Sequence, residues 1–424
     1  MHPRDLASLA SEETIFGGFA AEKLKRLQAE LEPLSRRYDV VVANPPYMGS
    51  KNMNKWLGDW VKKHYKDVKG DLFSCFMARN VGMGAEHAQL GFMTPYVWMF
   101  IGTYEKLRKF VIQQNTITSL IQLEYSGFSG ATVPICTFTL QKGYCPGYRG
   151  GYVRLSDFVG ADQQAPRALE ALANPDCGWF YRVNANKFKV IPGSPIDYWA
   201  TDSAFKSFNE KQFLNEKIDA RVGLITGDGN RFLRLWHEVG RSKISFGNKE
   251  GSAQTLKWVP YTKGGEFRLW YGNFDYVVNW ERDGWEMKND NYDGARVRAH
   301  NFNGPQSFKE GITWNSISSS RFHCRYVPKG FLFDAAGPLC EVLDEALLAF
   351  MLGLLSSSTF AYFMQLMNPT MNFPPGYLGA VPFIQPSDAE KENVNKLVKG
   401  NVELSKQDWN SFETSWDYAH HPLV

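Results

Sequence analysis

The decisive stretch is Tyr38-Asp39-Val40-Val41-Val42-Ala43-Asn44-Pro45-Pro46-Tyr47. Its first six residues form a short valine-rich run, which is typical of a strand buried on both faces, as in a parallel sheet. The run ends at two prolines, which lack the N–H group needed for ladder pairing. We therefore predict a strand that carries Asn44 to Tyr47 at its carboxyl end, where ligands bind in open α/β sheets.

Strand and helix patterns alternate around this stretch. Leucines at helical spacing predict an amphipathic helix over residues 20–37 that packs on the domain that follows. Asp71 is the predicted N-cap of a helix over residues 72–83. The alternation indicates βαβ units and a mainly parallel sheet. The other expected elements are strands over residues 89–94, 119–123 and 135–140 and a helix over residues 104–113.

The character of the chain changes after about residue 143. Four glycines and a proline cluster over residues 143–151, and the strand and helix signals beyond them are mixed and irregular. We place a domain boundary between residues 141 and 154. The expected fold class is α/β, with an N-terminal helical segment (1–37), a sheet-containing part (38–150) and a mixed α/β part (151–424).

Composition excludes several classes of protein. The chain has 424 residues and a formal net charge of +3, so any nucleic-acid footprint must come from local clustering. Its six cysteines form no CxxC pair and no metal-ligand spacing, which predicts reduced thiols, no metal site and a cytoplasmic location. The N-terminus has no apolar core of a signal peptide. The uncharged stretch over residues 346–367 is interrupted by serines, so we expect two buried helices and no membrane span.

Asn44, Pro45, Pro46 and Tyr47 suit chemistry on a planar amine. The exocyclic amine of adenine is a poor nucleophile because its lone pair is delocalised into the ring. The Asn44 side-chain oxygen and the Pro45 carbonyl can accept its two N–H groups, and the diproline fixes the direction of that carbonyl. Tyr47 offers a face for stacking a base taken out of the duplex. The alternative is a plain strand ending in an Asn-Pro turn.

These residues resemble the catalytic motif of N6-adenine DNA methyltransferases in which the methyl-donor region precedes the catalytic one. Residues 69–76 resemble the following helix of that family, residues 91–95 its next strand, and residues 128–133 a later motif. The resemblance implies S-adenosylmethionine as the methyl donor, with Phe76 and Asp71 in the donor site. It also implies that Tyr47 and Phe128 stack on the two faces of the flipped adenine.

The resemblance extends to the large methyltransferases of the BREX phage-defence system (PglX-type), which places the chain with restriction-modification-like functions. Weak matches in the same order run over residues 226–232, 260–272, 309–314, 353–357 and 368–373. That family carries a Gly-rich donor loop upstream of the catalytic motif, and Ile15-Phe16-Gly17-Gly18-Phe19 lacks the preceding apolar strand. We therefore expect a truncated or split enzyme whose missing N-terminal part, or other defence-system subunits, could be partners.

The second half resembles a target-recognition domain for double-stranded DNA, because basic and aromatic residues interleave there. The sequence around Gly227-Asp228-Gly229 lacks the further acids or Lys-Ser/Thr of a metal or phosphate site, so we interpret it as a turn. The predicted DNA-binding residues are Lys263, Arg268, Lys309, Arg321 and Arg325.

Three functions stay open at this point. The first is site-specific adenine N6-methylation of DNA with base flipping. The second is a non-catalytic DNA-binding or assembly fragment of such an enzyme, because the donor loop is absent. The third is methylation of protein glutamine or of RNA, since the same residues can activate other planar amines; the large second half argues against it.

Overall fold

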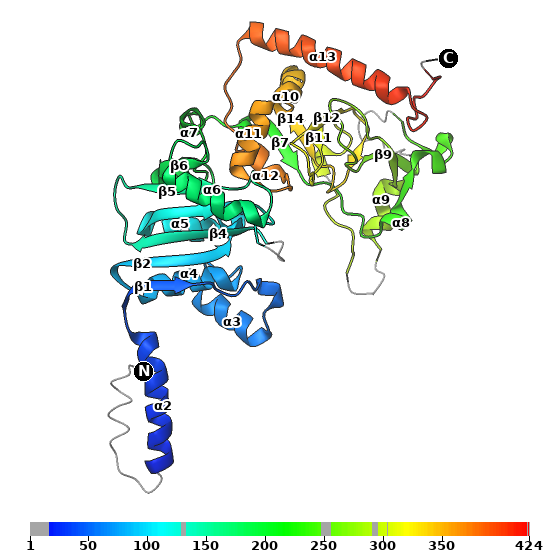
Figure 1. The fold of residues 1–424 in the computed structure, drawn as a ribbon. Coiled ribbons are helices and arrows are strands. Elements are labelled where there is room, and N and C mark those ends of the chain that lie inside the picture. Colours follow the sequence, from blue (N-terminus) through cyan, green and yellow to red (C-terminus); the bar gives the residue numbers. More distant parts are fainter. Residues whose placement is uncertain are drawn as a thin grey trace. The chain divides into compact units, whose positions relative to one another are not determined.

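The computed structural model describes residues 17–128, 133–246, 256–290, 296–302, 304–421 and 423. The chain forms two compact units, Met1–Thr201 and Asp202–Val424 (Figure 1). The predicted boundary between residues 141 and 154 falls inside the sheet of the first unit, which continues through two further strands, so compactness divides the chain at a later point.

A six-stranded sheet in the order β1-β2-β4-β3-β5-β6 is the centre of the first unit (Figure 1). The β1–β2 and β3–β5 pairs are parallel, whereas β4 runs antiparallel to both β2 and β3, and β6 antiparallel to β5. The expectation of a mainly parallel sheet was wrong, because β4 inserts between two parallel strands in the opposite direction. The strands are β1 (Tyr38–Ala43), β2 (Gly84–Pro95), β3 (Asn115–Gln122), β4 (Ile135–Lys142), β5 (Arg149–Arg154) and β6 (Phe180–Asn184).

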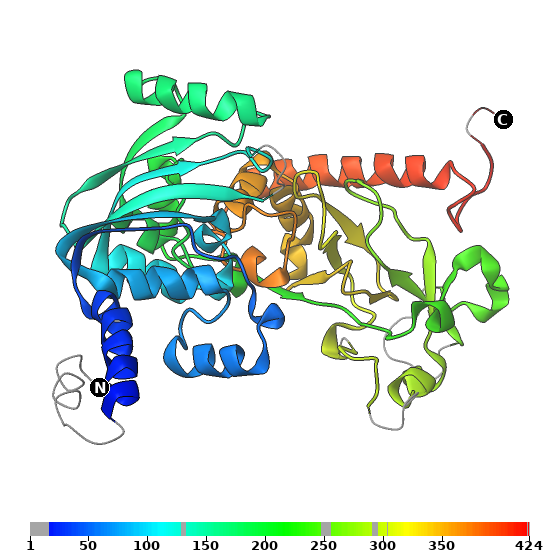
Figure 2. The ribbon, with the colours of Figure 1, turned by 60° about the horizontal axis from the view of Figure 1, so that its bottom comes forward.

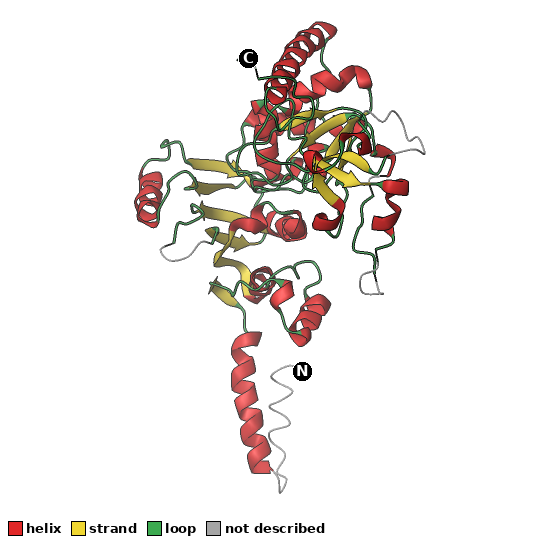
Figure 3. Cartoon of the chain, turned by 90° about the vertical axis from the view of Figure 1, so that its right-hand side faces the viewer, coloured by secondary structure: helices red, strands yellow, loops and turns green. Residues whose placement is uncertain are grey.

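Helices lie on both faces of this sheet. The helix α4 packs against β1 and β2, and α5 packs against β3. The helix α6 lies on the opposite side of the sheet from α4 and α5 (Figures 2 and 3). The expected helices and strands of this region are confirmed, including Asp71 as the N-cap of α4. The helices are α2 (Gly17–Ser35), α3 (Lys55–His64), α4 (Leu72–Met83), α5 (Glu105–Gln114) and α6 (Ala161–Ala173).

The strand β1 is an edge strand, not one buried on both faces as its valines suggested. Among the described residues it pairs with β2 alone. Val40 and Val42 point to the same face because side chains alternate along a strand, and they are 62% and 76% exposed. A valine-rich run therefore marks the strand correctly, but it does not show whether the structure covers both of its faces.

The helix α2 was expected to pack on the domain that follows, but it does not pack on the sheet. Its side chains Leu27, Leu31 and Leu34 are exposed, and Figure 1 shows the helix projecting from the β1 edge. Its last turn is held by Arg79, whose guanidinium donates to the Leu34 carbonyl at 2.9 Å. The leucine spacing predicted the helix, but the stripe of leucines has no apolar surface against it within the described part of the first unit.

Two four-stranded sheets form the second unit, in the orders β13-β9-β10-β8 and β12-β11-β14-β7. The first has a core around Tyr261, Trp280 and Leu332. The strands are β7 (Ile218–Arg221), β8 (Leu233–Leu235), β9 (Trp258–Thr262), β10 (Tyr276–Asn279), β11 (Gly311–Trp314), β12 (Cys324–Val327), β13 (Leu332–Phe333) and β14 (Leu339–Val342). Mixed sheets in both units confirm the α/β fold class.

A helical layer completes the second unit. Gly353 on α10 lets α13 approach closely, because a side-chain carbon at this position would meet Val398 at 2.8 Å. Trp409 of α13 packs into a second core with Tyr271 and Phe331. The helices are α7 (Asp202–Asn209), α8 (Gly229–Phe232), α9 (Glu281–Lys288), α10 (Leu348–Leu355), α11 (Ser358–Met367), α12 (Pro375–Leu378) and α13 (Asp388–Asn410).

The uncharged stretch forms two helices, as predicted, with Ser357 capping the second by accepting the Phe360 N–H at 3.1 Å. Within the described ranges, no single helix has the length and apolar character to cross a membrane. The segments Glu345–Leu355 and Ser358–Met367 would meet that test only as a pair, and they are bent by 75° at the serines. Met351, Leu355, Met364 and other side chains of the pair are buried.

Candidate active site

Three parallel strands end at one edge of the first sheet and place the candidate residues there. The strands β1, β2 and β3 all run in the same direction, because β4 is antiparallel to both of its neighbours. The loop Asn44–Tyr47 follows β1 directly, opposite the end of β2, where Ala43 is paired with Phe92. Pro45 is buried, whereas Asn44, Pro46 and Tyr47 are exposed. The buried Pro45 thus anchors the loop, and the side chains of Asn44 and Tyr47 face solvent.

The Tyr47 hydroxyl lies beside the side chain of Asn44. It is 3.2 Å from the Asn44 Oδ1 atom and 3.3 Å from the Met93 carbonyl oxygen, and it can donate to either. Partial burial raises the pKa of the Tyr47 phenol, so the hydroxyl keeps its proton. The Tyr47 ring meets the ring of Phe73 edge-on, with centroids 6.4 Å apart. These contacts fix both the ring plane and the direction of the Asn44 oxygen.

Asp71, predicted to bind the donor, braces the loop over residues 44–47, which is the candidate catalytic loop. Its Oδ1 atom accepts the Met48 N–H at 2.9 Å and the Phe73 N–H at 3.2 Å, so one carboxylate both caps α4 and holds the residue after Tyr47. The Leu72 N–H donates to the Met48 carbonyl at 3.1 Å and adds a second tie. Asp71 is therefore a positioning residue for the loop.

Phe76 and Phe128 are both exposed aromatic side chains. Phe76 lies on α4, the helix that Asp71 caps. Phe128 follows β3, whose carboxyl end lies at the same sheet edge as the ends of β1 and β2. The topology thus brings Asn44, Tyr47 and Phe128 to one edge. Residues 129–132 of the predicted motif over residues 128–133 lie outside the described residues.

Tyr96 also belongs to this edge, although the sequence did not single it out. It follows the end of β2, and its N–H donates to the Pro134 carbonyl at 2.7 Å. Burial raises the pKa of its phenol, and the nearby Tyr125 and Glu124 raise it further. The signal that could have found Tyr96 is its position directly after the predicted strand end at Pro95, which matches the position of the Asn-Pro-Pro-Tyr loop after β1.

Arg325, predicted to bind DNA, is only 1% exposed, so its guanidinium does not reach the surface. It donates to the Asn315 Oδ1 atom at 3.0 Å and to the Arg268 carbonyl at 3.4 Å. Burial lowers its pKa to about 10. The expectation that Arg325 contacts DNA is corrected: β12 turns this side chain into the unit, where it ties loops together.

The other predicted DNA-binding residues of the second unit differ in their engagement. Arg321 is exposed. The remaining three contact their own unit: Arg268 pairs with Asp408 at 2.8 Å and lies over the Trp409 ring, Lys309 pairs with Glu341 at 2.5 Å, and Lys263 lies over the Tyr276 ring. Arg268, Lys309 and Lys263 are thus already engaged by acidic or aromatic side chains of their own unit, which makes them less available to DNA phosphates than the sequence pattern suggested.

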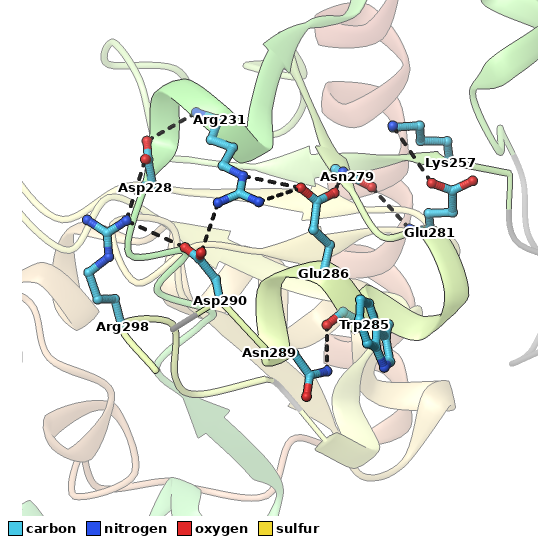
Figure 4. A network of polar contacts seen from close by, with 10 residues as sticks. All are labelled: Asp228, Arg231, Lys257, Asn279, Glu281, Trp285, Glu286, Asn289, Asp290 and Arg298. Carbon is cyan, nitrogen blue, oxygen red and sulfur yellow. Dashed lines mark hydrogen bonds and ion pairs between the residues drawn. The ribbon is translucent and has the colours of Figure 1, made fainter. Parts of the chain in front are cut away.

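The Gly227-Asp228-Gly229 stretch is a turn, as predicted, and an ion-pair network holds it. Asp228 accepts the Arg231 N–H at 3.1 Å and so caps α8. Figure 4 shows the Arg231 guanidinium between Glu286 and Asp290. Each of these two ion pairs has a nitrogen–oxygen distance of 2.8 Å. The Asp290 side chain, 10% exposed, also meets Arg298 at 3.5 Å. In the described parts of the chain, no group of three His, Cys, Asp or Glu side chains could hold a metal ion.

The thiols carry no cross-links. All six cysteines are free, and four of them, Cys75, Cys136, Cys324 and Cys340, are buried. Burial raises the pKa of the Cys75 thiol to about 11 and that of Cys136 to about 12. Buried, protonated thiols of this kind are weak nucleophiles, so they add no reactive group to the candidate active site.

The chain is similar in sequence to known DNA-modifying enzymes. Residues 12–128 match the family of Eco57I restriction-modification methylases. The chain is 37% identical over 409 residues to the adenine-specific methyltransferase PglX of Lacticaseibacillus casei (strain Zhang), covering 95% of this chain and 34% of that protein. It is 36% identical over 413 residues to the adenine-specific methyltransferase BrxX of Escherichia coli O9:H4 (strain HS), covering 94% of this chain and 32% of that protein.

Solved structures share the fold. The restriction-modification enzyme MmeI, solved in complex with DNA, matches with a TM-score of 0.56 and 11% identity over 89% of this chain and 50% of its own. A nuclease-deletion mutant of LlaGI, solved with a DNA substrate mimic, matches with a TM-score of 0.53 and 12% identity over 95% of this chain and 37% of its own. The chain spans about a third of the length of the PglX and BrxX proteins to which it is related.

Proposed function

We propose that this relative of PglX and BrxX transfers a methyl group from S-adenosylmethionine to the N6 amine of an adenine in DNA, within a phage-defence or restriction-modification system. The adenine is extruded from the duplex and enters at the carboxyl edge of β1, β2 and β3. Asn44 and Pro45 bind the amine, the adjoining Pro46 fixes the loop, and Tyr47 and Phe128 stack on the base.

The contact between Asn44 and Tyr47 is the observation that carries the proposal. A carbonyl oxygen has two lone pairs, so the Asn44 Oδ1 atom can accept an amine N–H while Tyr47 donates to it at 3.2 Å. When the hydroxyl donates instead to the Met93 carbonyl, at 3.3 Å, the Asn44 oxygen is left entirely to the amine. Tyr47 thereby orients the acceptor as well as offering a ring to the base.

The reaction needs little from the protein beyond this arrangement. Two acceptors on the N–H groups favour tetrahedral geometry at nitrogen, and they return electron density to it. The nitrogen then bonds to the methyl carbon while the carbon–sulfur bond breaks, the electron pair stays on sulfur, and the amine releases a proton to solvent. Acceptors that are fixed before the reaction stabilise the developing positive charge without reorganisation.

The donor lies near α4 in this proposal. Phe76 is exposed on that helix and offers a ring for stacking on the adenine of the donor. The Asp71 carboxylate contributes indirectly, because its Oδ1 atom already accepts two backbone N–H groups and holds the loop against α4. S-adenosylmethionine supplies a sulfonium methyl to the edge where Asn44 holds the amine.

The test compares the full chain with its Asn44→Ala variant on long, unmethylated mixed-sequence DNA and labelled donor, followed by nucleoside analysis. We expect label in N6-methyladenine and a loss of about 10²- to 10³-fold in the variant, the size found when one fixed polar partner of the reacting group is removed. Asn209→Ala, an exposed asparagine at the end of α7, is the matched control and should keep the full rate.

Each other outcome rejects the proposal. Label in protein or RNA, offered in parallel reactions, would assign the site to a different amine. DNA binding without any transfer would make this chain a recognition or assembly module. Undiminished methylation by the Asn44→Ala variant would remove the loop from the chemistry.

A further inference from the structure

Between the catalytic loop and α4 the chain makes an excursion, residues 50–70, that contains α3. Its two ends are clasped together: the Ser50 N–H donates to the Gly70 carbonyl at 3.1 Å, and Gly49 is bridged to Asp71. The clasp is shared with the ties between Met48 and Asp71 that brace the catalytic loop. The excursion therefore starts three residues after Tyr47 and returns to the same place, so it is fixed beside the candidate active site.

The excursion is strongly basic. It holds six lysines and two aspartates, a net charge of 6 − 2 = +4, whereas the whole chain has only 47 − 44 = +3. All six lysines are exposed. The basic residues are Lys51, Lys55, Lys62, Lys63, Lys66 and Lys69. The excursion thus carries more net positive charge than the whole chain, and the remaining residues sum to 3 − 4 = −1.

A hollow of about 540 Å³ is lined mainly by the excursion, including Lys55, Lys66 and Lys69, and is completed by Thr103 and Lys106. Two other lysines at this hollow have acidic partners: Lys62 is 3.8 Å from Asp59, and Lys106 is 2.5 Å from Asp67. Within the described residues, Lys55, Lys66 and Lys69 lie within 4 Å of no carboxylate. Five lysines and two aspartates line the hollow, a net charge of 5 − 2 = +3, which favours anions.

The helix α3 adds two features that suit the same kind of ligand. Asn54 caps it, accepting the Leu57 N–H at 2.9 Å, and the first turn lies at the hollow, where the positive end of the helix dipole favours anions. Trp56, next to Lys55, is 74% exposed. Large aromatic rings left in water beside lysines are typical of surfaces that bind nucleic acids.

We infer that the α3 excursion is a phosphate-binding clamp for DNA, with Lys55, Lys66 and Lys69 contacting the backbone that flanks the extruded adenine. The inference rests on the proposed function, because a strand that delivers its base to Tyr47 carries its phosphates past the clasped excursion. Position favours DNA over other polyanions: a membrane or an acidic protein would gain nothing from attachment to a base-binding loop.

The test is the salt dependence of DNA binding by the full chain, measured with the triple variant Lys55→Gln/Lys66→Gln/Lys69→Gln. Each phosphate contact contributes about 0.9 to the slope of log K against log salt concentration, so the slope should become shallower by about 2.7. The triple variant Lys391→Gln/Lys396→Gln/Lys399→Gln on α13 removes the same charge and is the control, which should keep the wild-type slope. Circular dichroism verifies that both variants fold.

The outcomes separate this inference from the proposed function. Asn44→Ala should lose methylation and keep the wild-type slope, since it touches the base and not the phosphates. If the wild-type chain binds DNA and its slope is the same in the triple variant, or the α13 control lowers it equally, the clamp is refuted while methylation stands. If the triple variant loses binding to phosphatidylserine vesicles or to a polyglutamate peptide but not to DNA, the excursion serves a different partner.

Discussion

Two stretches of this chain look alike in sequence and differ in structure. The α3 excursion and residues 257–329 both interleave lysines or arginines with aromatic residues. In the excursion the cations are exposed, and Lys55, Lys66 and Lys69 surround a hollow. In the later stretch Arg325 is buried, and Arg268 is engaged by an acid and a ring of its own unit. Similar composition thus gives exposed cations in the first unit, whereas in the second unit Arg325 is buried and Arg268 contacts other side chains of its own unit.

The difference lies in where the partners come from. Arg268 meets Asp408, 140 residues further along the chain, and Lys309 meets Glu341. The excursion is closed at its base between Ser50 and Gly70 and is short. The acidic residues that it contains are its two aspartates. Basic residues therefore stay more available to a ligand in a short, closed segment than in a region where acidic residues from distant parts of the chain pair with them.

The largest effect that would sharpen this contrast is expected for Arg325→Met. Removing the guanidinium leaves Asn315 Oδ1 unsatisfied inside the second unit. We expect a loss of about 3 kcal/mol in the free energy of unfolding of that unit, as for other broken buried polar contacts. Denaturant titration measures it. An unchanged midpoint would mean that Arg325 is not a structural residue, and the contrast would fail.

The next effect concerns activity and distinguishes the two roles of Tyr47. Tyr47→Ala should lower the methylation rate by about ten- to a hundredfold, because stacking on one base contributes about 1–3 kcal/mol. Tyr47→Phe keeps the ring and loses only the hydroxyl contacts to Asn44 and Met93, so its methylation rate should lie between those of the wild-type chain and Tyr47→Ala. Equal rates for the Ala and Phe variants would show that the hydroxyl, not the ring, matters.

The smallest effect is a pH dependence in the second unit. His323 is buried, its Nδ1 atom lies 3.1 Å from the Arg321 carbonyl, and burial lowers its pKa below the ordinary value of 6.5. As the pH falls, the unfolded chain takes up the proton first. Stability is therefore full above about pH 6.5, the unfolded pKa, and is lost as the pH falls from there toward the folded pKa.

His323→Gln removes this titration. Unfolding titrations at pH 7.5 and pH 5.5 should show a smaller decrease in stability for the variant than for the wild-type chain. An equal decrease in both proteins would assign the acid sensitivity to other groups.

Local signals in the sequence predicted much of the fold. Asp71 marks the start of α4, the serines mark the break between α10 and α11, and Asp228 marks a turn, because caps and turns depend on neighbouring residues. Strand direction was not predictable in this way: β4 pairs with β2 and β3, and nothing within β4 itself encodes its antiparallel orientation.

The candidate site was predictable where a motif carries its own chemistry. Asn44 and Tyr47 were identified because a strand end, two prolines and an aromatic side chain adjoin in the sequence. The support that this loop receives from Met93 and Asp71 was not predicted, because these residues belong to other parts of the chain. Met93 acts through its backbone carbonyl, and Asp71 through a carboxylate oxygen that accepts two N–H groups. Arg325 was misjudged for the same reason: burial is a property of the folded chain.

The open side of β1 has a practical consequence for handling this protein. Within the described residues, no strand pairs with the outer side of β1, where the side chains of Val40 and Val42 are exposed, so another strand can pair there. Asp39 is the one charged residue in β1 that opposes such pairing. We expect concentrated solutions of the isolated chain to self-associate through this strand. A lysine in place of Val42 would act as a gatekeeper, so a solubility screen of such variants is a sensible first step toward crystals.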